Sequence, residues 1–270
     1  MKLWNTETLK NYMRIKYQLA PGFEHLENWI RELPEYFANN GQSIFKSRNE
    51  VKIFDVEKFQ LNVKAFKVPN LINRFAYVYI RGSKAERSYN YASKFFSLGI
   101  PTPRAIGFVE CLSNGLLRNS YFISLHCNYD FTLREVLNYQ VSGRDEILCQ
   151  WIGFTFLKLH QNNIFHRDYS PGNVLINKVD NKYEFNIIDL NRMKFKYIDF
   201  NTGLKNFRQL DTDHDTLQLL ASEYARLRGQ DKMKASNRLF KYDRKNKLSR
   251  HGRGKIKRAV KLIFRSGHDV

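Results

Sequence analysis

The strongest constraint on this chain is the stretch from Ile164 to Leu190. It contains IFHRDYSPGNVLI, eight intervening residues and then FNIIDL. Its polar groups include Asp168, Asn173 five residues later, and Asp189 at the end of an apolar run. Phosphoryl transfer uses groups at this spacing, because one carboxylate accepts the proton of the attacking hydroxyl while an amide oxygen and a second carboxylate hold magnesium on the nucleotide phosphates.

The elements expected on either side of this stretch favour the same chemistry. A helix face precedes it, formed by Leu148, Trp151, Ile152, Thr155 and Leu159. Two strand-like runs follow, at 174–176 and 185–188. The pattern H-R-D-x-x-x-x-N followed by an acidic residue is the kinase template, although D-L-N replaces D-F-G. A polar turn of this composition also joins helices to strands in other proteins. The order of helix, loop, hairpin and carboxylate favours a phosphotransferase site.

Composition and charge restrict the class of protein. The 270 residues, 43% of them hydrophobic, predict one folded domain or two small lobes. The net charge of +19 predicts an anionic partner, which nucleic acid, an acidic membrane or a phosphorylated substrate would each satisfy. The three cysteines show no zinc-binding spacing, and no apolar run is long enough to span a membrane. These features predict a cytosolic protein, with a peripheral membrane contact allowed.

The first half of the chain predicts a nucleotide-binding sheet. Residues 1–40 read as helix and loop, and three strands are expected at 43–46, 51–56 and 59–66. Lys64 in the third strand aligns with the kinase lysine that contacts the α and β phosphates, and Lys67 is the competing candidate. A glycine-rich phosphate loop is missing from the first turn. Lys46 or Arg48 would supply charge there, or the turn is an ordinary hairpin.

A helix beginning at Ser83 carries the expected partner of Lys64. Glu86 is the candidate carboxylate, although Ser83 and Glu86 also have the spacing of a capping box, which would explain Glu86 without any role at the site. Two further strands are expected at 105–109 and 121–125. The boundary between the lobes then falls near residue 127.

The C-terminal part adds acidic and basic clusters. Asp211, Asp213 and Asp215 precede a helix, and capping it is their expected role, with a metal cluster as the alternative. Residues 232–265 contain 14 Lys and Arg and one acidic residue. A basic amphipathic helix for an anionic membrane surface is expected from the spacing of Ile256, Ala259, Val260 and Ile263. A solvated tail is the alternative, and RNA binding is disfavoured because no RNA-binding motif accompanies the charge.

Five motifs together resemble one family. They are LNVKAFK at 61–67, SKAERSYNYA at 83–92, LGIPTP at 98–103, HRDYSPGN at 166–173 and IIDLNR at 187–192. Over residues 43–225 the chain resembles the lipopolysaccharide core kinases, the Kdo/WaaP family of the protein-kinase-like superfamily. The resemblance implies an α+β, two-lobed protein-kinase-like fold with a small, mainly β N-terminal lobe and a larger, mainly helical C-terminal lobe. We expect these at residues 1–127 and 128–230, followed by a basic tail at 231–270.

The resemblance also implies an activity and a set of roles. The reaction would be ATP-dependent phosphorylation of a Kdo or heptose hydroxyl in the lipopolysaccharide inner core. Asp168 would be the catalytic base, Asn173 and Asp189 the ligands of Mg²⁺, and Lys64 the phosphate contact with Glu86 behind it. The enzyme would work on an anionic glycolipid at the inner face of the cytoplasmic membrane of a Gram-negative bacterium.

Two other functions compete with this hypothesis. One is another small-molecule or protein kinase of the superfamily, such as an aminoglycoside-type phosphotransferase, but those substrates are cationic and suit a protein of charge +19 poorly. The other is a pseudokinase-like module that binds membrane or RNA. The presence of all three residues, Asp168, Asn173 and Asp189, argues against such a module. Which sugar is phosphorylated and the oligomeric state stay open.

Overall fold

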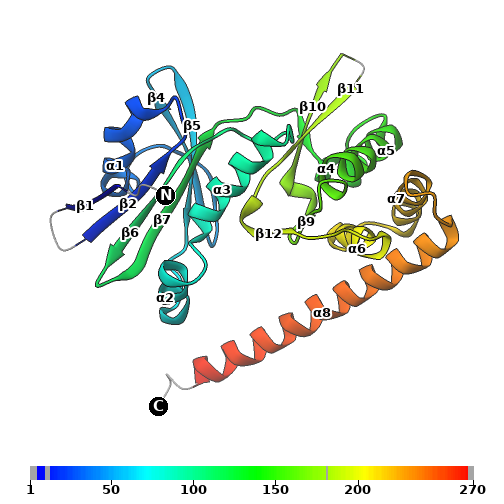
Figure 1. Ribbon diagram of the computed structural model, residues 1–270. Coiled ribbons are helices and arrows are strands. Elements are labelled where there is room, and N and C mark those ends of the chain that lie inside the picture. The colour runs from blue at the N-terminus through cyan, green and yellow to red at the C-terminus, as the bar shows by residue number, and fades with distance from the viewer. Residues whose placement is uncertain (1–4, 10–12, 181, 267–270) are drawn as a thin grey trace. The chain divides into compact units, whose positions relative to one another are not determined.

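The computed structural model describes residues 5–9, 13–180 and 182–266, with side chains described for residues 14–180 and 182–251. The chain divides into two units (Figure 1). Unit 1 comprises Met1–Asn128 together with Asn186–Asn191, and unit 2 comprises Tyr129–Phe185 together with Arg192–Val270. The segment around Asp189 therefore belongs to unit 1, although it follows more than fifty residues of unit 2 in the chain.

Unit 1 is built on an antiparallel sheet. Among the described residues it has seven strands in the order β1-β2-β6-β7-β5-β4-β3. The strands are β1 (Asn5–Leu9), β2 (Met13–Leu19), β3 (Gln42–Lys46), β4 (Glu50–Val56), β5 (Phe59–Phe66), β6 (Ala105–Ser113) and β7 (Leu116–Leu125). β3 to β5 confirm the three expected strands. β6 and β7 are longer than expected and meet at Asn114 and Gly115, which both have positive φ, as a tight hairpin turn of this kind requires.

β1 and β2 correct the expectation of helix and loop for residues 1–40. In β2, Ile15 and Tyr17 are buried while Arg14 is exposed, which is the alternation of a strand. Tyr17 lies opposite Val109 of β6. With only two buried apolar positions the local signal is weak, and the strand depends on a partner about ninety residues away in the chain.

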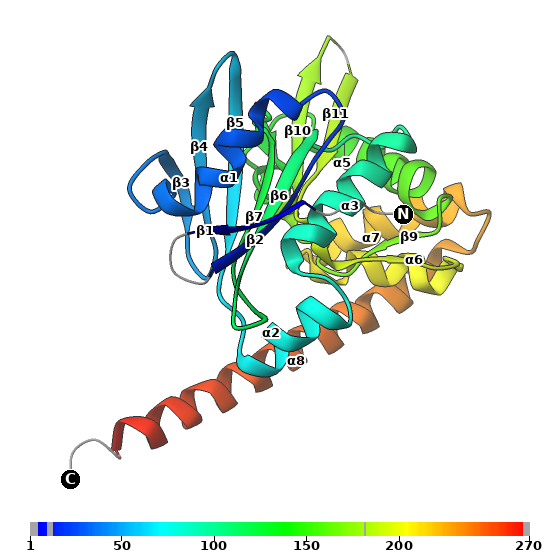
Figure 2. The ribbon, with the colours of Figure 1, turned by 60° about the vertical axis from the view of Figure 1, so that its left-hand side comes forward.

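Helices cover both faces of this sheet (Figure 2). α1 (Glu27–Tyr36), preceded by the 3-10 turn η1 (Glu24–Leu26), buries Ile30 and Leu33 against one face. It continues past Pro34 to Tyr36, so this proline does not end the helix, although it has no N–H to donate to the carbonyl of Ile30. α3 (Lys84–Ser97) packs on the other face, where the ring centroids of Tyr89 and Phe108 are 5.6 Å apart. α2 (Leu71–Tyr79) lies beside the turn of the β6–β7 hairpin.

Unit 2 is mainly helical. Its helices are α4 (Leu133–Leu137), α5 (Arg144–Phe154), the π-helical turn η2 (Thr155–His160), the 3-10 turns η3 (Pro171–Asn173) and η5 (Phe207–Gln209), α6 (Phe200–Asn206), α7 (His214–Leu227) and α8 (Lys232–Ser266). Short strands accompany them: β8 (Phe131–Thr132), β9 (Ile164–His166), β10 (Val174–Val179), β11 (Lys182–Ile187) and β12 (Met193–Phe195). β11, β10 and β8 form one sheet, and β12 pairs with β9.

Two expectations for unit 2 are confirmed. The helix face predicted before the catalytic loop is formed by α5 and η2 together, and its five apolar or Thr positions are all buried. Asp213 caps α7, since its side chain accepts a hydrogen bond from the Thr216 N–H at 2.8 Å. The alternative of a metal cluster finds no support, because the described residues contain no group of three His, Cys, Asp or Glu side chains able to hold an ion.

α8 occupies the basic C-terminal region. Its first turns pack on α6, η5 and α7 through buried Ala235, Leu239 and Asp243. The apolar positions expected at 256, 259, 260 and 263 lie outside the described side chains. Among the described helices, none combines the length and the apolar character needed to cross a bilayer.

Candidate active site

The loop that carries Asp168 folds back on itself in unit 2. The backbone carbonyl of Asp168 accepts hydrogen bonds from the Ser170 N–H and from the side-chain amide of Asn173, both at 2.8 Å. The Asp168 N–H donates to Nδ1 of His166 at 3.1 Å. The structure therefore brings together Asp168 and Asn173, as the motif predicts. The Asp168 carboxylate is partly exposed, and its Oδ2 lies 3.0 Å from Nη1 of Arg192.

The loop is anchored by the buried side chain of Tyr169. The hydroxyl of Tyr169 accepts a hydrogen bond from Trp151 Nε1 at 3.0 Å and lies 2.8 Å from the hydroxyl of Thr155. The ring of His166 stacks on the same tyrosine, with centroids 5.3 Å apart. Burial raises the pKa of Tyr169 far above its usual value, so the phenol stays protonated. The residue that follows Asp168 is thereby fixed to α5 and η2.

A second buried network holds the backbone just before Asp168. The two ring nitrogens of His160 contact the hydroxyl of Tyr224 at 2.9 Å and Oδ1 of Asn206 at 3.1 Å. The amide nitrogen of Asn206 then donates to the carbonyl of His166 at 2.7 Å. Burial lowers the pKa of His160 to about 4, so its ring is neutral at pH 7. Neither network was predicted from the sequence.

Unit 1 holds the other half of the predicted site. Nζ of Lys64 lies 2.7 Å from Oδ1 of Asp189, and the same oxygen accepts a hydrogen bond from the side-chain amide of Asn191. Asp189 has φ 59, a left-handed conformation that is uncommon outside glycine and concentrates at functional positions. The backbone before it is held by the Pro101–Thr102 segment, because the Thr102 hydroxyl donates to the carbonyl of Ile187 at 2.7 Å.

The expected ion pair between Lys64 and Glu86 is not formed. Glu86 instead lies 3.4 Å from Nζ of Lys16 on β2, the strand that the sequence reading missed. Lys16 also lies 3.3 Å from the buried carboxylate of Glu110. Burial raises the pKa of Glu110, while the Lys16 ammonium opposes that effect. Ser83 caps α3, because its hydroxyl accepts a hydrogen bond from the Glu86 N–H at 3.1 Å, but the Glu86 carboxylate contacts Lys16 and does not complete the capping box.

The other basic candidates stand apart from Asp189. Lys46 is exposed at the end of β3 and lies 3.4 Å from Glu50, four residues along the chain. Arg48 and Lys67 are also exposed. Of the four basic side chains considered for phosphate binding, Lys64 is the one placed against a carboxylate of the predicted metal site.

Asn173 and Asp189 are chemically suited to Mg²⁺. The amide nitrogen of Asn173 is used by the Asp168 carbonyl, which leaves its oxygen as the group that a cation would contact. Asp189 adds a carboxylate. Mg²⁺ prefers such oxygen ligands and completes its shell with water and substrate phosphates. Asn173 lies in unit 2 and Asp189 in unit 1.

Comparison with known proteins decides the family. Residues 70–229, more than half of the chain, match the model of the lipopolysaccharide kinase (Kdo/WaaP) family. The chain belongs to this family. Among curated protein sequences, none matches the chain. The resemblance suggested by the motifs is confirmed, and this lipopolysaccharide kinase is a phosphotransferase.

A solved structure supports the fold. The structure titled "WaaP in complex with acyl carrier protein" is similar with a TM-score of 0.55 and 15% sequence identity, over 86% of this chain and 98% of that one. At this identity the similarity shows the fold alone. It confirms the expected kinase-like fold, with a mainly β N-terminal region and a helical C-terminal region.

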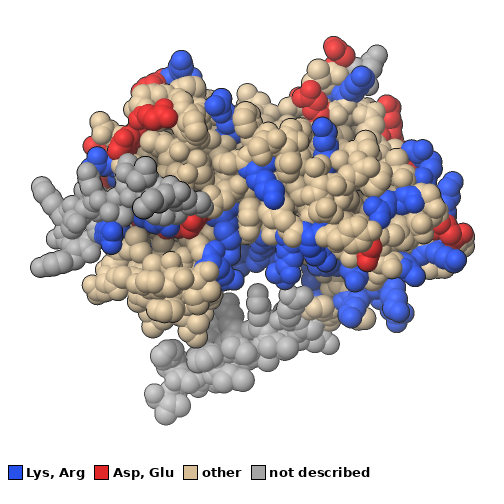
Figure 3. Space-filling view, viewed as in Figure 1, with Lys and Arg blue, Asp and Glu red and all other residues tan. Residues whose placement is uncertain are grey.

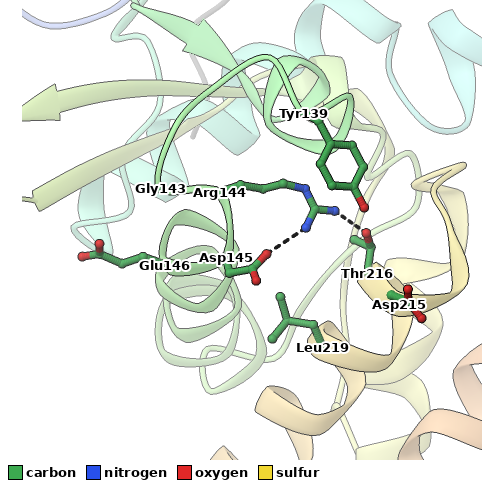
Figure 4. Close-up of a pocket in the computed structure, with 8 residues that line it drawn as sticks. All are labelled: Tyr139, Gly143, Arg144, Asp145, Glu146, Asp215, Thr216 and Leu219. Atoms are coloured by element: carbon green, nitrogen blue, oxygen red, sulfur yellow. Dashed lines mark hydrogen bonds and ion pairs between the residues drawn. The ribbon is translucent and has the colours of Figure 1, made fainter.

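A pocket of this lipopolysaccharide kinase lies in unit 2, between the start of α5 and α7 (Figure 4). Arg144 stacks on the ring of Tyr139, pairs with Asp145 at 2.8 Å and hydrogen-bonds the hydroxyl of Thr216. Burial alone would raise the pKa of Asp213 beside it, but hydrogen bonds from Thr216 and Tyr139 hold that pKa well below its usual range. Arg144 thus uses its charge within the protein and joins the start of α5 to α7 through Thr216.

Arg192 is the residue of the site whose role the sequence reading missed. It stands in the motif IIDLNR, where it was assigned no role of its own. In the structure it contacts the carboxylate of Asp168. The sequence does show a basic residue three positions after Asp189. Its spacing gave no reason to predict that it contacts Asp168.

Proposed function

We propose that this kinase transfers a phosphoryl group from ATP to a sugar hydroxyl, of Kdo or heptose, in the inner core of lipopolysaccharide. The observation that carries the proposal is the loop in which Asp168 and Asn173 are hydrogen-bonded together, inside the region matched by the family model. Asp168 accepts the proton of the sugar hydroxyl. We assign this to its Oδ1, because Oδ2 contacts Arg192.

The remaining site residues bind the nucleotide in this proposal. Lys64 contacts the α and β phosphates, and Asn173 and Asp189 hold Mg²⁺, which when bound neutralises charge on the phosphates. Asp189 would then leave Lys64, with which it pairs at 2.7 Å in the structure. We assign Glu86 of α3 as the carboxylate that supports Lys64 in that state. This requires Glu86 to exchange its contact with Lys16 for one with Lys64.

The proposed location is the inner face of the cytoplasmic membrane. The acceptor is an anionic glycolipid, and the chain carries a net charge of +19. The described part of α8 adds eight exposed basic side chains: Lys232, Lys234, Arg238, Lys241, Arg244, Lys245, Lys247 and Arg250. Such a surface is attracted to both the membrane and the substrate.

The test uses ATP, Mg²⁺ and two purified acceptors: lipid A carrying Kdo alone, and the same lipid extended with heptose. Phosphate on the first acceptor identifies a Kdo kinase, and phosphate on the second alone identifies a heptose kinase. Asp168→Asn should lower the rate by about 100-fold or more, the usual contribution of a general base. Asp180→Asn is the matched control, because Asp180 is an exposed turn residue of the same unit with the positive φ that Asn tolerates.

The outcomes separate the competing functions. Equal rates for wild type and Asp168→Asn would remove Asp168 from the mechanism. Nucleotide binding without transfer to either acceptor would point to another substrate of the superfamily. An absence of magnesium-dependent nucleotide binding would favour a binding module that performs no phosphoryl transfer.

A further inference from the structure

The outward face of α2 in unit 1 consists of large apolar side chains. Ile72 is 80% exposed, Leu71 67%, Tyr79 61% and Phe75 52%, and Ile80 at the helix end is 73% exposed. The rings of Phe75 and Tyr79 pack together with centroids 4.8 Å apart. Soluble proteins rarely expose contiguous apolar groups of this size unless the patch contacts a partner or a membrane.

The inward face of the same helix is polar and firmly attached. Arg74 is buried, and its Nε donates to the carbonyl of Leu117 on β7 at 2.7 Å. Tyr77 is buried beside it. Asn70 caps the first turn by accepting a hydrogen bond from the Asn73 N–H at 3.0 Å. α2 is therefore held with its apolar residues outward, and a rotation that hid them would break the Arg74 bond.

The charge around this face is of one sign. From Lys67 to Arg81 the chain contains no acidic residue. Lys67 before α2, Arg81 after it and Arg118 on the neighbouring β7 are exposed. In Figure 3 the surface over α2 is uncharged. An apolar stripe with cations at both ends matches a surface that is apolar at depth and anionic at its boundary.

We infer that α2 is the element through which this protein contacts an anionic lipid bilayer. Leu71, Ile72 and Phe75 enter the boundary between headgroups and acyl chains, and Lys67 and Arg81 stay at the headgroups. The aromatic pair suits this interface, where aromatic rings are enriched. The inference builds on the proposed membrane location, names the element responsible, and is independent of which sugar is phosphorylated.

The experiment measures binding of the full chain to vesicles of phosphatidylglycerol and phosphatidylethanolamine that contain no lipopolysaccharide. The affinity of the variant Ile72→Ser/Phe75→Ser for these vesicles should be lower by about tenfold or more, since two large apolar side chains are removed from the contact. The matched control is Ile44→Ser/Phe45→Ser, which removes the same two residue types from exposed positions of β3 in the same unit. The control should bind like wild type. Vesicles of phosphatidylcholine should bind wild type more weakly than anionic vesicles do.

Measurements at low and high salt distinguish the contribution of α2 to vesicle binding from that of the basic helix α8. Salt screens the attraction between charges but does not weaken apolar contacts in this way. Equal binding of wild type and Ile72→Ser/Phe75→Ser at both salt concentrations overturns the inference. So does a wild-type dimer that the substitution makes monomeric while vesicle binding is unchanged, which would assign the face to a second copy of the chain. Circular dichroism verifies that each variant is folded. Vesicle binding through α2 without sugar phosphorylation would overturn the proposed acceptor and leave this inference standing.

Discussion

Acidification should weaken the network under the catalytic loop through one buried histidine. His160 is 2% exposed, and its burial lowers its pKa to about 4, whereas a histidine in the unfolded chain has a pKa of about 6.5. Between these values the unfolded chain binds the proton and the folded chain does not. The stability contributed by neutral His160 is thus complete above pH 6.5 and falls as the pH decreases toward 4. Between pH 7 and pH 5 this effect lowers the free energy of unfolding by about 2 kcal/mol.

The assay compares the free energy of unfolding in urea for wild type and His160→Gln at both pH values. Glutamine keeps a donor and an acceptor for Tyr224 and Asn206 but takes up no proton, so the other titrating groups cancel in the difference. The advantage of wild type over the variant should be smaller at pH 5 by about 2 kcal/mol. His251→Gln, at an exposed position of α8, is the matched control for replacing a histidine by glutamine in the same unit. If the free energy of unfolding depends on pH in the same way for wild type and for His160→Gln, the proposed role of His160 is refuted.

Two further predictions follow from single contacts. Lys64→Met should weaken ATP binding by about tenfold or more in isothermal titration, because the ammonium near phosphate is lost, whereas Lys67→Met should leave binding unchanged. Equal losses would contradict the assignment of Lys64. Gly203→Ala should lower the free energy of unfolding by about 1–3 kcal/mol, since a Cβ there would overlap the hydroxyl of Tyr224. Gly153→Ala, in a helix and with nothing within 4 Å of its Cβ, should be neutral or stabilising in the same urea titration.

The parts of the fold that the sequence predicts are those with local signals. β4 and β5 show alternation, tight turns join β3, β4 and β5, and the cap at Asp213 depends on a residue only three positions away. The catalytic loop is likewise local, because Asn173 reaches the Asp168 carbonyl across five residues. For these elements the interaction that stabilises the structure lies within the same short stretch of sequence.

The parts that could not be predicted depend on distant partners. β2 needs β6, and the network under the loop joins His160 to Tyr224 and Asn206, residues 64 and 46 positions away. α2 is the clearest case. Its pattern of apolar residues would normally place Leu71 and Phe75 in a core, but the burial of Arg74 on the opposite side, fixed by a carbonyl of β7, turns that face outward.

The ion pair between Lys64 and Asp189 also depends on residues that are distant in the sequence. Glu86 was expected to pair with Lys64, with capping of the helix as the alternative, and no competing cation for Glu86 was predicted. The structure supplies one in Lys16, which lies between Glu86 and the buried Glu110 and neutralises a carboxylate that burial would otherwise leave uncompensated. Lys64 is then satisfied by Asp189. Because the proposed function needs Asp189 for Mg²⁺, nucleotide binding has to replace this contact, and the phosphates that Lys64 would bind are the group able to do so.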